Sequence, residues 1–133
     1  GGQIINKNIE KFSATNSKRF KVVKNLGQIN YLSAMRHVDL LIGNSSSGII
    51  EAASFSKPVV NIGDRQSGRV KSKNIIDTSI SNLGNSIDLA LSSDFKDKCK
   101  NIKNAYGDGN ASSIIINELI KQPLSVKKFF KDI

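Results

Sequence analysis

The sequence predicts an α/β fold in which a mainly parallel β-sheet is flanked by helices. Short β-branched runs alternate with stretches of helical periodicity along the chain, and this alternation is typical of βαβ units. Right-handed crossovers between parallel strands place the connecting helices on both faces of such a sheet. The length of 133 residues fits one domain that buries a core without disulfides or metals.

The predicted strands are short and rich in β-branched residues. They are expected at residues 20–24, 38–42, 58–62 and 74–77. The run at 38–42 is the strongest candidate for a buried strand, because it is apolar and ends at Gly43. Pro58 stands at the first position of its strand, where a missing N–H donor is tolerated.

Helical patterns cover much of the remaining chain. They are expected at residues 4–16, 28–36, 48–56, 84–92, 94–105 and 111–121. The helix at 48–56 should end before Pro58, and Asn110 is expected to cap the helix that follows it. After Pro123, the apolar residues of the segment 122–133 recur at helical spacing and predict a C-terminal tail helix.

In parallel α/β sheets, ligands bind beyond the carboxyl ends of the strands. This rule directs attention to the loops at 25–28, 43–48 and 62–70. The loop at 43–48 reads Gly-Asn-Ser-Ser-Ser-Gly and leads from a strand into a helix. Free N–H groups and a partial positive charge at a helix N-terminus suit phosphate. The alternative is that Ser45–Ser47 only cap the helix, and both interpretations can hold together.

Two further features lie at the same predicted edge of the sheet. Glu51 stands about one turn into the predicted helix, where a carboxylate either favours the helix dipole or accepts hydrogen bonds from two sugar hydroxyls. The polar loop at 63–73 carries Arg65 and Arg69, whose planar guanidinium groups suit phosphate oxygens. Together with the serine loop, these residues predict an anion-binding site.

The formal net charge of +9 indicates nucleic acid, a membrane surface or a small anion as a partner. Aromatic residues make up only 6% of the chain and no nucleic-acid-binding motif is present, which argues against nucleic acid. No apolar run spans a bilayer and no signal peptide is evident, so we expect no membrane partner and a cytoplasmic location. The lone Cys99 fits a reducing cytosol. No metal-ligand spacing occurs, and no cofactor or metal is expected.

Three segments in this order resemble the C-terminal domain of the hydrolysing UDP-N-acetylglucosamine 2-epimerases. They are Asp-Leu-Leu-Ile-Gly-Asn-Ser-Ser-Ser-Gly-Ile-Ile-Glu-Ala at 39–52, Lys-Pro-Val-Val-Asn-Ile-Gly-Asp-Arg-Gln-Ser-Gly-Arg at 57–69, and Tyr-Gly-Asp-Gly-Asn-Ala at 106–111. The resemblance covers roughly residues 20–120. It implies a Rossmann-like parallel sheet that is the C-terminal half of a GT-B-type two-domain enzyme. Residues 1–133 would then form a single, N-terminally truncated nucleotide-binding domain that lacks its first strand or strands.

The resemblance also implies a site for UDP on this domain. Ser45 and Ser46 would bind the diphosphate, helped by the N–H groups near Ser47 and Gly48. Glu51 would hold the ribose hydroxyls.

Arg65 matches an arginine of the same region and would contact a phosphate or order its loop. The turn at Leu26, Gly27 and Gln28 would lie against the uracil, mostly through backbone groups. UDP or UDP-N-acetylglucosamine is therefore the expected ligand, with GDP-linked sugars left open as the alternative.

The family reaction eliminates UDP from UDP-N-acetylglucosamine and then adds water, which gives N-acetylmannosamine for sialic-acid-type or surface-polysaccharide sugars. The resemblance implies that its acid–base residues lie in segments outside this chain, so no catalytic residue is expected here and the chain alone should have little turnover. Members commonly form homo-oligomers. Two alternatives remain, the nucleotide-binding domain of another GT-B glycosyltransferase and a basic nucleic-acid-binding module.

Overall fold

A computed structural model describes residues 2–123 of the chain. By its internal contacts the chain divides into two compact units, residues 1–34 and 35–133, and each is described by itself. The predicted tail helix at 122–133 lies almost entirely outside the described residues. The prediction that residues 1–133 form one nucleotide-binding domain stays a prediction.

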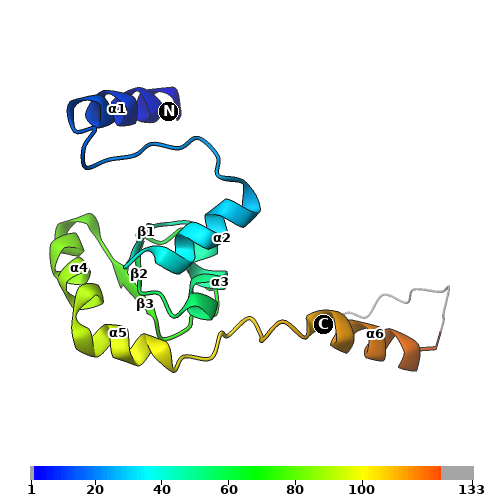
Figure 1. Ribbon diagram of the computed structural model, residues 1–133. Coiled ribbons are helices and arrows are strands. Elements are labelled where there is room, and N and C mark those ends of the chain that lie inside the picture. The colour runs from blue at the N-terminus through cyan, green and yellow to red at the C-terminus, as the bar shows by residue number, and fades with distance from the viewer. Residues whose placement is uncertain (1, 124–133) are drawn as a thin grey trace. The chain divides into compact units, whose positions relative to one another are not determined.

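The first unit holds α1, Gly2–Thr15, and the beginning of α2, Gly27–His37 (Figure 1). The helix expected at 4–16 is confirmed, and the ring of Phe12 packs edge-on against Phe20 with centroids 4.9 Å apart. The strand predicted at 20–24 is wrong. Its residues are irregular and exposed, and no strand within the described residues pairs with them. A β-branched run without a neighbouring strand leaves its backbone groups unpaired and does not form a stable strand.

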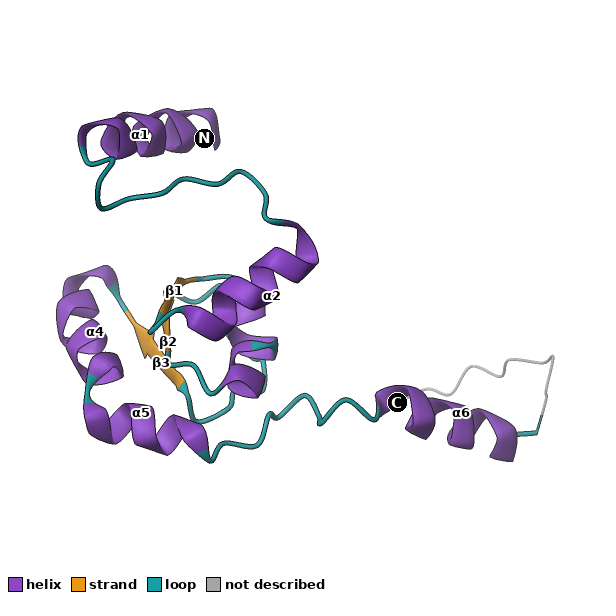
Figure 2. Cartoon of the chain, in the orientation of Figure 1, coloured by secondary structure: helices purple, strands orange, loops and turns teal. Residues whose placement is uncertain are grey.

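The second unit is built around a parallel sheet of three strands in the order β1-β2-β3 (Figure 2). The strands are β1 Leu41–Gly43, β2 Val59–Ile62 and β3 Ile75–Thr78. Leu41 pairs with Val59, which in turn pairs with Ile75. The predicted α/β class and three of the four predicted strands are confirmed, although the first of the three begins three residues later than expected.

Helices cover both faces of this sheet. The helical elements that follow α2 are α3 Ser46–Ile50, the short 3₁₀ helices η1 Ala52–Phe55 and η2 Ile80–Asn82, α4 Leu83–Leu91, α5 Ser93–Lys100 and α6 Ala111–Lys121. Of these, α3 packs on β1 and β2, whereas α4 packs on β2 and β3 from the opposite side (Figure 2). The helices on the two faces thus bury the central strand, as expected of a parallel α/β sheet.

The core lies between the central strand and these helices. Its buried apolar residues are Met35, Ile49, Ala52, Ala53, Val59, Val60, Ala90 and Cys99. Cys99 has no exposed surface, and this burial raises the pKa of its thiol. A protonated, buried thiol is a small apolar side chain, so Cys99 has a structural role.

Two predicted helices have different bounds in the structure. The helix expected at 48–56 begins earlier, at Ser46, and is divided at Glu51 into α3 and η1. Ser56 ends η1 with a left-handed backbone, φ 56°, two residues before Pro58. The helix expected at 94–105 ends at Lys100. No helix within residues 2–123 has the length and apolarity needed to cross a membrane.

Candidate functional site

The turn between β1 and α3 forms the centre of the candidate site. Gly43 ends the strand with φ 149°, and Ser45 then adopts an extended backbone at the N-cap of α3. The N–H of Ser47 donates to the hydroxyl oxygen of Ser45 at 3.3 Å, so the capping interpretation of this serine is confirmed. Its hydroxyl hydrogen stays available for a second partner, because accepting a hydrogen bond leaves the donor function of a hydroxyl unused.

Glu51 lies at a different point of the helix from the one predicted. Because α3 ends at Ile50, Glu51 occupies the C-cap and not the first turn. Negative charge is unfavourable at the C-terminus of α3, and although Glu51 is also the N-cap of η1, its side chain makes no capping hydrogen bond there. Its carboxylate instead turns back along α3 and accepts a hydrogen bond from the Ser47 hydroxyl at 2.5 Å. The half-buried carboxylate thus faces the turn that carries the serines.

The polar loop after β2 reaches the same turn. Gln66 Nε2 donates to the backbone carbonyl oxygen of Asn44 at 2.8 Å, and Arg65 Nη1 donates to Asn44 Oδ1 at 3.5 Å. The expectation that the two loops meet at the carboxyl edge of the sheet is therefore confirmed. Neither Asn44 nor Gln66 was predicted to have a role, although they stand inside the loops at 43–48 and 62–70.

A polar cluster lies beneath this loop, where β2 and β3 end. Asn61 is buried and donates to Asp77 Oδ1 at 2.7 Å, and Lys71 Nζ lies 2.8 Å from both carboxylate oxygens of Asp77. Partial burial raises the pKa of Asp77, but the hydrogen bonds from Lys71 and Asn61 and the charge of Lys71 outweigh it and hold the pKa below its ordinary value. These bonds attach Lys71, near the end of the loop after β2, to the sheet.

Residues after α5 form hydrogen bonds to the C-terminal end of α3 and to the loop after β2. Asn104 Nδ2 donates to the Ile50 carbonyl oxygen at 2.8 Å, and the Tyr106 hydroxyl donates to the Val70 carbonyl oxygen at 3.0 Å. These bonds give Asn104 and Tyr106 a structural role. Asn110 occupies the N-cap position of α6 as predicted, but its side chain makes no capping hydrogen bond.

The turn at 25–27 belongs to the first unit and is described within it alone. Asn25 Oδ1 accepts a hydrogen bond from the Gly27 N–H at 2.7 Å, and Gly27 has φ 66°, so the predicted turn is confirmed. A depression of about 620 Å³ lies along residues 23–28 and Tyr31, and includes Leu26 and Gly27. Their contact with uracil stays a prediction.

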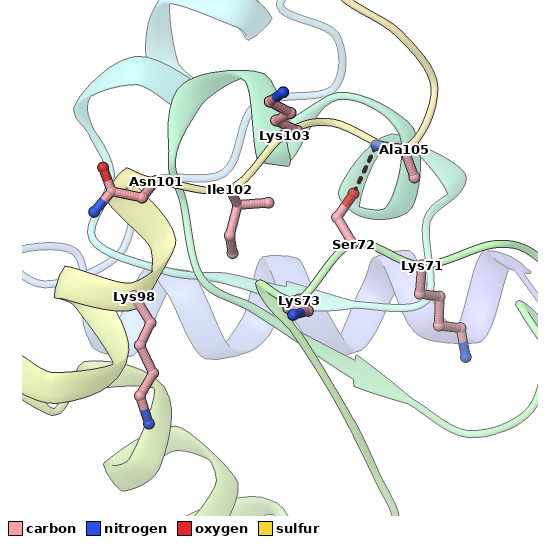
Figure 3. Close-up of a pocket in the computed structure, with 8 residues that line it drawn as sticks. All are labelled: Lys71, Ser72, Lys73, Lys98, Asn101, Ile102, Lys103 and Ala105. Atoms are coloured by element: carbon pink, nitrogen blue, oxygen red, sulfur yellow. Dashed lines mark hydrogen bonds between the residues drawn. The ribbon is translucent and has the colours of Figure 1, made fainter.

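Figure 3 shows the residues that line a second cavity, of about 650 Å³. Its lining residues are Lys71, Ser72, Lys73, Lys98, Asn101, Ile102, Lys103 and Ala105, and the Ala105 N–H donates to the Ser72 hydroxyl at 3.0 Å. None of the residues predicted to bind the nucleotide lines it. Residues 71–74 lead into the amino end of β3, and amino ends lie at the sheet edge opposite the carboxyl ends.

Comparison with known proteins identifies the family. A family model described as UDP-N-acetylglucosamine 2-epimerase matches residues 1–120. The chain is 43% identical over 95 residues to the GDP/UDP-N,N'-diacetylbacillosamine 2-epimerase (hydrolyzing) of Campylobacter jejuni, covering 71% of this chain and 25% of that protein. It is 37% identical over 114 residues to the UDP-N,N'-diacetylbacillosamine 2-epimerase (hydrolyzing) of Legionella pneumophila, covering 84% and 29%.

A third relative is the polysialic acid biosynthesis protein P7 of Escherichia coli, 31% identical over an alignment of 138 residues that covers 100% of this chain and 35% of that protein. The chain thus spans about a quarter to a third of the length of these curated relatives. The family model matches nearly the whole chain, and the loops that carry the sequence resemblance meet in the structure. The chain belongs to the UDP-N-acetylglucosamine 2-epimerase family.

Proposed function

We propose that this chain supplies the UDP-binding part of a hydrolysing 2-epimerase, which converts UDP-N-acetylglucosamine to N-acetylmannosamine and UDP. The observation that carries the proposal is the meeting of the loops at 43–48 and 62–70 through Asn44, at the carboxyl edge of a parallel sheet. Ligands of α/β proteins bind at this edge, and two loops held together there offer hydroxyl, N–H and guanidinium donors to one anion.

Each predicted residue has a role in this proposal. The hydroxyls of Ser45 and Ser46 and the N–H groups of Ser47 and Gly48 bind the diphosphate, which leaves with the negative charge when the bond to the sugar breaks. Arg65 is exposed and offers its guanidinium to a phosphate oxygen.

Glu51 holds the ribose hydroxyls in the same proposal, with one carboxylate oxygen oriented by Ser47. Leu26 and Gly27 contact the uracil. The catalytic acid–base residues belong to the part of the enzyme outside this chain. The complete enzyme acts in the cytoplasm as a homo-oligomer, without a nucleic-acid or membrane partner.

A second candidate differs in the sugar. Two of the relatives are named for N,N'-diacetylbacillosamine, which favours a UDP-linked form of that sugar as the substrate of the complete enzyme. Both candidates share the UDP site, so the nucleotide experiment below tests them together. Incubating the complete enzyme with each UDP-sugar and identifying the released free sugar decides between them.

Calorimetric titration of the chain with UDP, GDP and inorganic phosphate tests the site. We expect UDP to bind more tightly than phosphate, and Ser45→Ala/Ser46→Ala to weaken UDP at least about tenfold, because hydrogen bonds to charged groups are among the strongest single contacts. Thermal unfolding checks that the variant stays folded after losing its helix cap.

The matched control is Ser112→Ala/Ser113→Ala, which alters two neighbouring exposed serines of α6. This variant should bind UDP like the unaltered chain. A folded chain that does not bind UDP, or one whose two serine pairs matter equally, contradicts the proposal.

A further inference from the structure

Gln66 differs from its neighbours in the loop after β2. Asp64, Arg65 and Ser67 are exposed, whereas Gln66 has only 3% of its surface exposed. Its Nε2 donates to the backbone carbonyl oxygen of Asn44 at 2.8 Å, across 22 residues of sequence. That carbonyl belongs to the peptide unit that joins Asn44 to Ser45, so Gln66 holds the backbone directly in front of the α3 cap.

The other polar atom of this amide has no partner. Gln66 Oε1 is buried and makes no hydrogen bond within the part of the chain that the structure describes. Leaving a buried acceptor unpaired costs more free energy than one ordinary hydrogen bond contributes. The unpaired Oε1 thus offsets the free energy that the Nε2 bond to Asn44 contributes, so an apolar side chain of the same size would suit the stability of the loop about as well. The amide is better explained by the geometry that it imposes on Asn44.

The neighbouring hydrogen bond, from Arg65 to Asn44, is exposed and long, unlike the bond from Gln66. Arg65 is exposed, and its bond to Asn44 Oδ1 measures 3.5 Å, which is long for a hydrogen bond. A guanidinium held this loosely can leave Asn44 for a phosphate oxygen, while the shorter bond from buried Gln66 keeps the two loops together.

We propose that Gln66 is a positioning residue, which fixes the Asn44–Ser45 peptide so that the donors of the serine turn face the anion. The inference rests on the proposed function, since it assigns to Gln66 the alignment of the same phosphate-binding turn. Gln66 itself does not touch the ligand.

The test is Gln66→Met, which keeps the length of the side chain but removes both polar atoms. We expect the midpoint of thermal unfolding to change little, because the loss of the hydrogen bond to Asn44 is offset by the removal of the unpaired acceptor. The dissociation constants for UDP and for inorganic phosphate should both increase by about five- to tenfold, since the loss of one aligning hydrogen bond is of that size. The matched control is Gln122→Met, at an exposed position, which should change neither quantity.

The outcomes separate the two proposals. If the unaltered chain does not bind UDP, the proposed function fails. If it binds UDP and Gln66→Met binds equally well, only the positioning role fails. A Gln66→Met chain that unfolds, or whose melting temperature falls together with its affinity, shows a purely structural role and overturns the inference. Gln66→Leu, which is also apolar but shorter, repeats the measurement with an independent side chain.

Discussion

Gly48 lies in α3 against the central strand, with almost no room beside it. A Cβ atom added at this position would come within 3.1 Å of Val59 Cγ1, and Val59 is itself buried. Close helix–strand packing explains a glycine here better than backbone freedom does, because no left-handed conformation is needed.

We predict that Gly48→Ala destabilises the chain by about 1 kcal/mol, because the strain of overpacking exceeds the gain in helix propensity. The control is Gly84→Ala in α4, where an added Cβ meets nothing within 4 Å. That variant should gain up to about 1 kcal/mol, the difference in helix propensity between the two residues. Urea denaturation of both variants measures the two effects. Equal changes in the two glycine variants would contradict the packing argument.

The position of single residues could be predicted where one local rule decides it. The Ser45 cap and the turn at Gly27 follow from the residue types alone. The role of Gln66 could not be predicted, because its partner is a backbone atom on another loop. Glu51 was misplaced because the helix start was expected two residues too late, at Gly48, whereas α3 begins at Ser46 and ends before Glu51.

Strands β2 and β3 are joined at their carboxyl ends by Asn61, Asp77 and Lys71. The pKa of Asp77 is lowered in the folded chain, so the ionised carboxylate stabilises the fold at pH values above its ordinary pKa. This contribution is lost as the pH falls from about 4, the value for an unfolded chain, through the lower folded pKa.

We predict that Asp77→Asn removes this part of the acid dependence. The unaltered chain should lose stability below about pH 4 more steeply than the variant, because only the former protonates this group. The measurement is the urea midpoint from pH 2.5 to 6, with Asp88→Asn, an exposed carboxylate of α4, as the comparison. If the urea midpoints of the unaltered chain and of Asp77→Asn fall equally as the pH is lowered, the ionised carboxylate of Asp77 does not stabilise the fold.

Elements could be predicted from the sequence where the local pattern and the tertiary partners agree. The parallel sheet, α1, α4 and α6 follow their hydrophobic periodicity closely. The run at 20–24 has the composition of a strand but no partner strand among the described residues, and pairing cannot be read from composition. The helix expected to reach residue 105 stops at Lys100, and Asn104 instead binds the end of α3.

Buried side chains are concentrated in one part of the described chain. Residues 59–61 of β2 are buried, whereas every residue of α6 is exposed, including Ile114, Leu119 and Ile120. Helices that bury no apolar face gain little stability from packing, so the stability of the chain is concentrated in the sheet and its covering helices.

We predict a matching pattern of amide hydrogen exchange, measured by mass spectrometry at neutral pH. Peptides from β2 should exchange slowest, because their opening approaches global unfolding, and peptides from α1 and α6 should exchange fastest. The same measurement on the complete enzyme, about three times as long as this chain if it resembles the relatives, shows whether the remaining residues protect α1 and α6 from exchange. Protection of α6 equal to that of β2 in the isolated chain would contradict this view.

The segment between β2 and β3 can change its length during evolution without disturbing the sheet. Parallel neighbours are commonly joined through a helix, but here residues 63–74 make the return as an irregular connector that also carries Arg65 and Gln66. Fully extended, that connector has a contour length of roughly 40 Å, at about 3.3–3.6 Å per residue, whereas running back along a strand as short as β3 needs only about 13 Å. The connector is therefore much longer than the distance that it has to span. Residues at its exposed tip can be inserted or deleted at low entropic cost. Related proteins can therefore change the anion that this loop binds without shifting the register of the sheet.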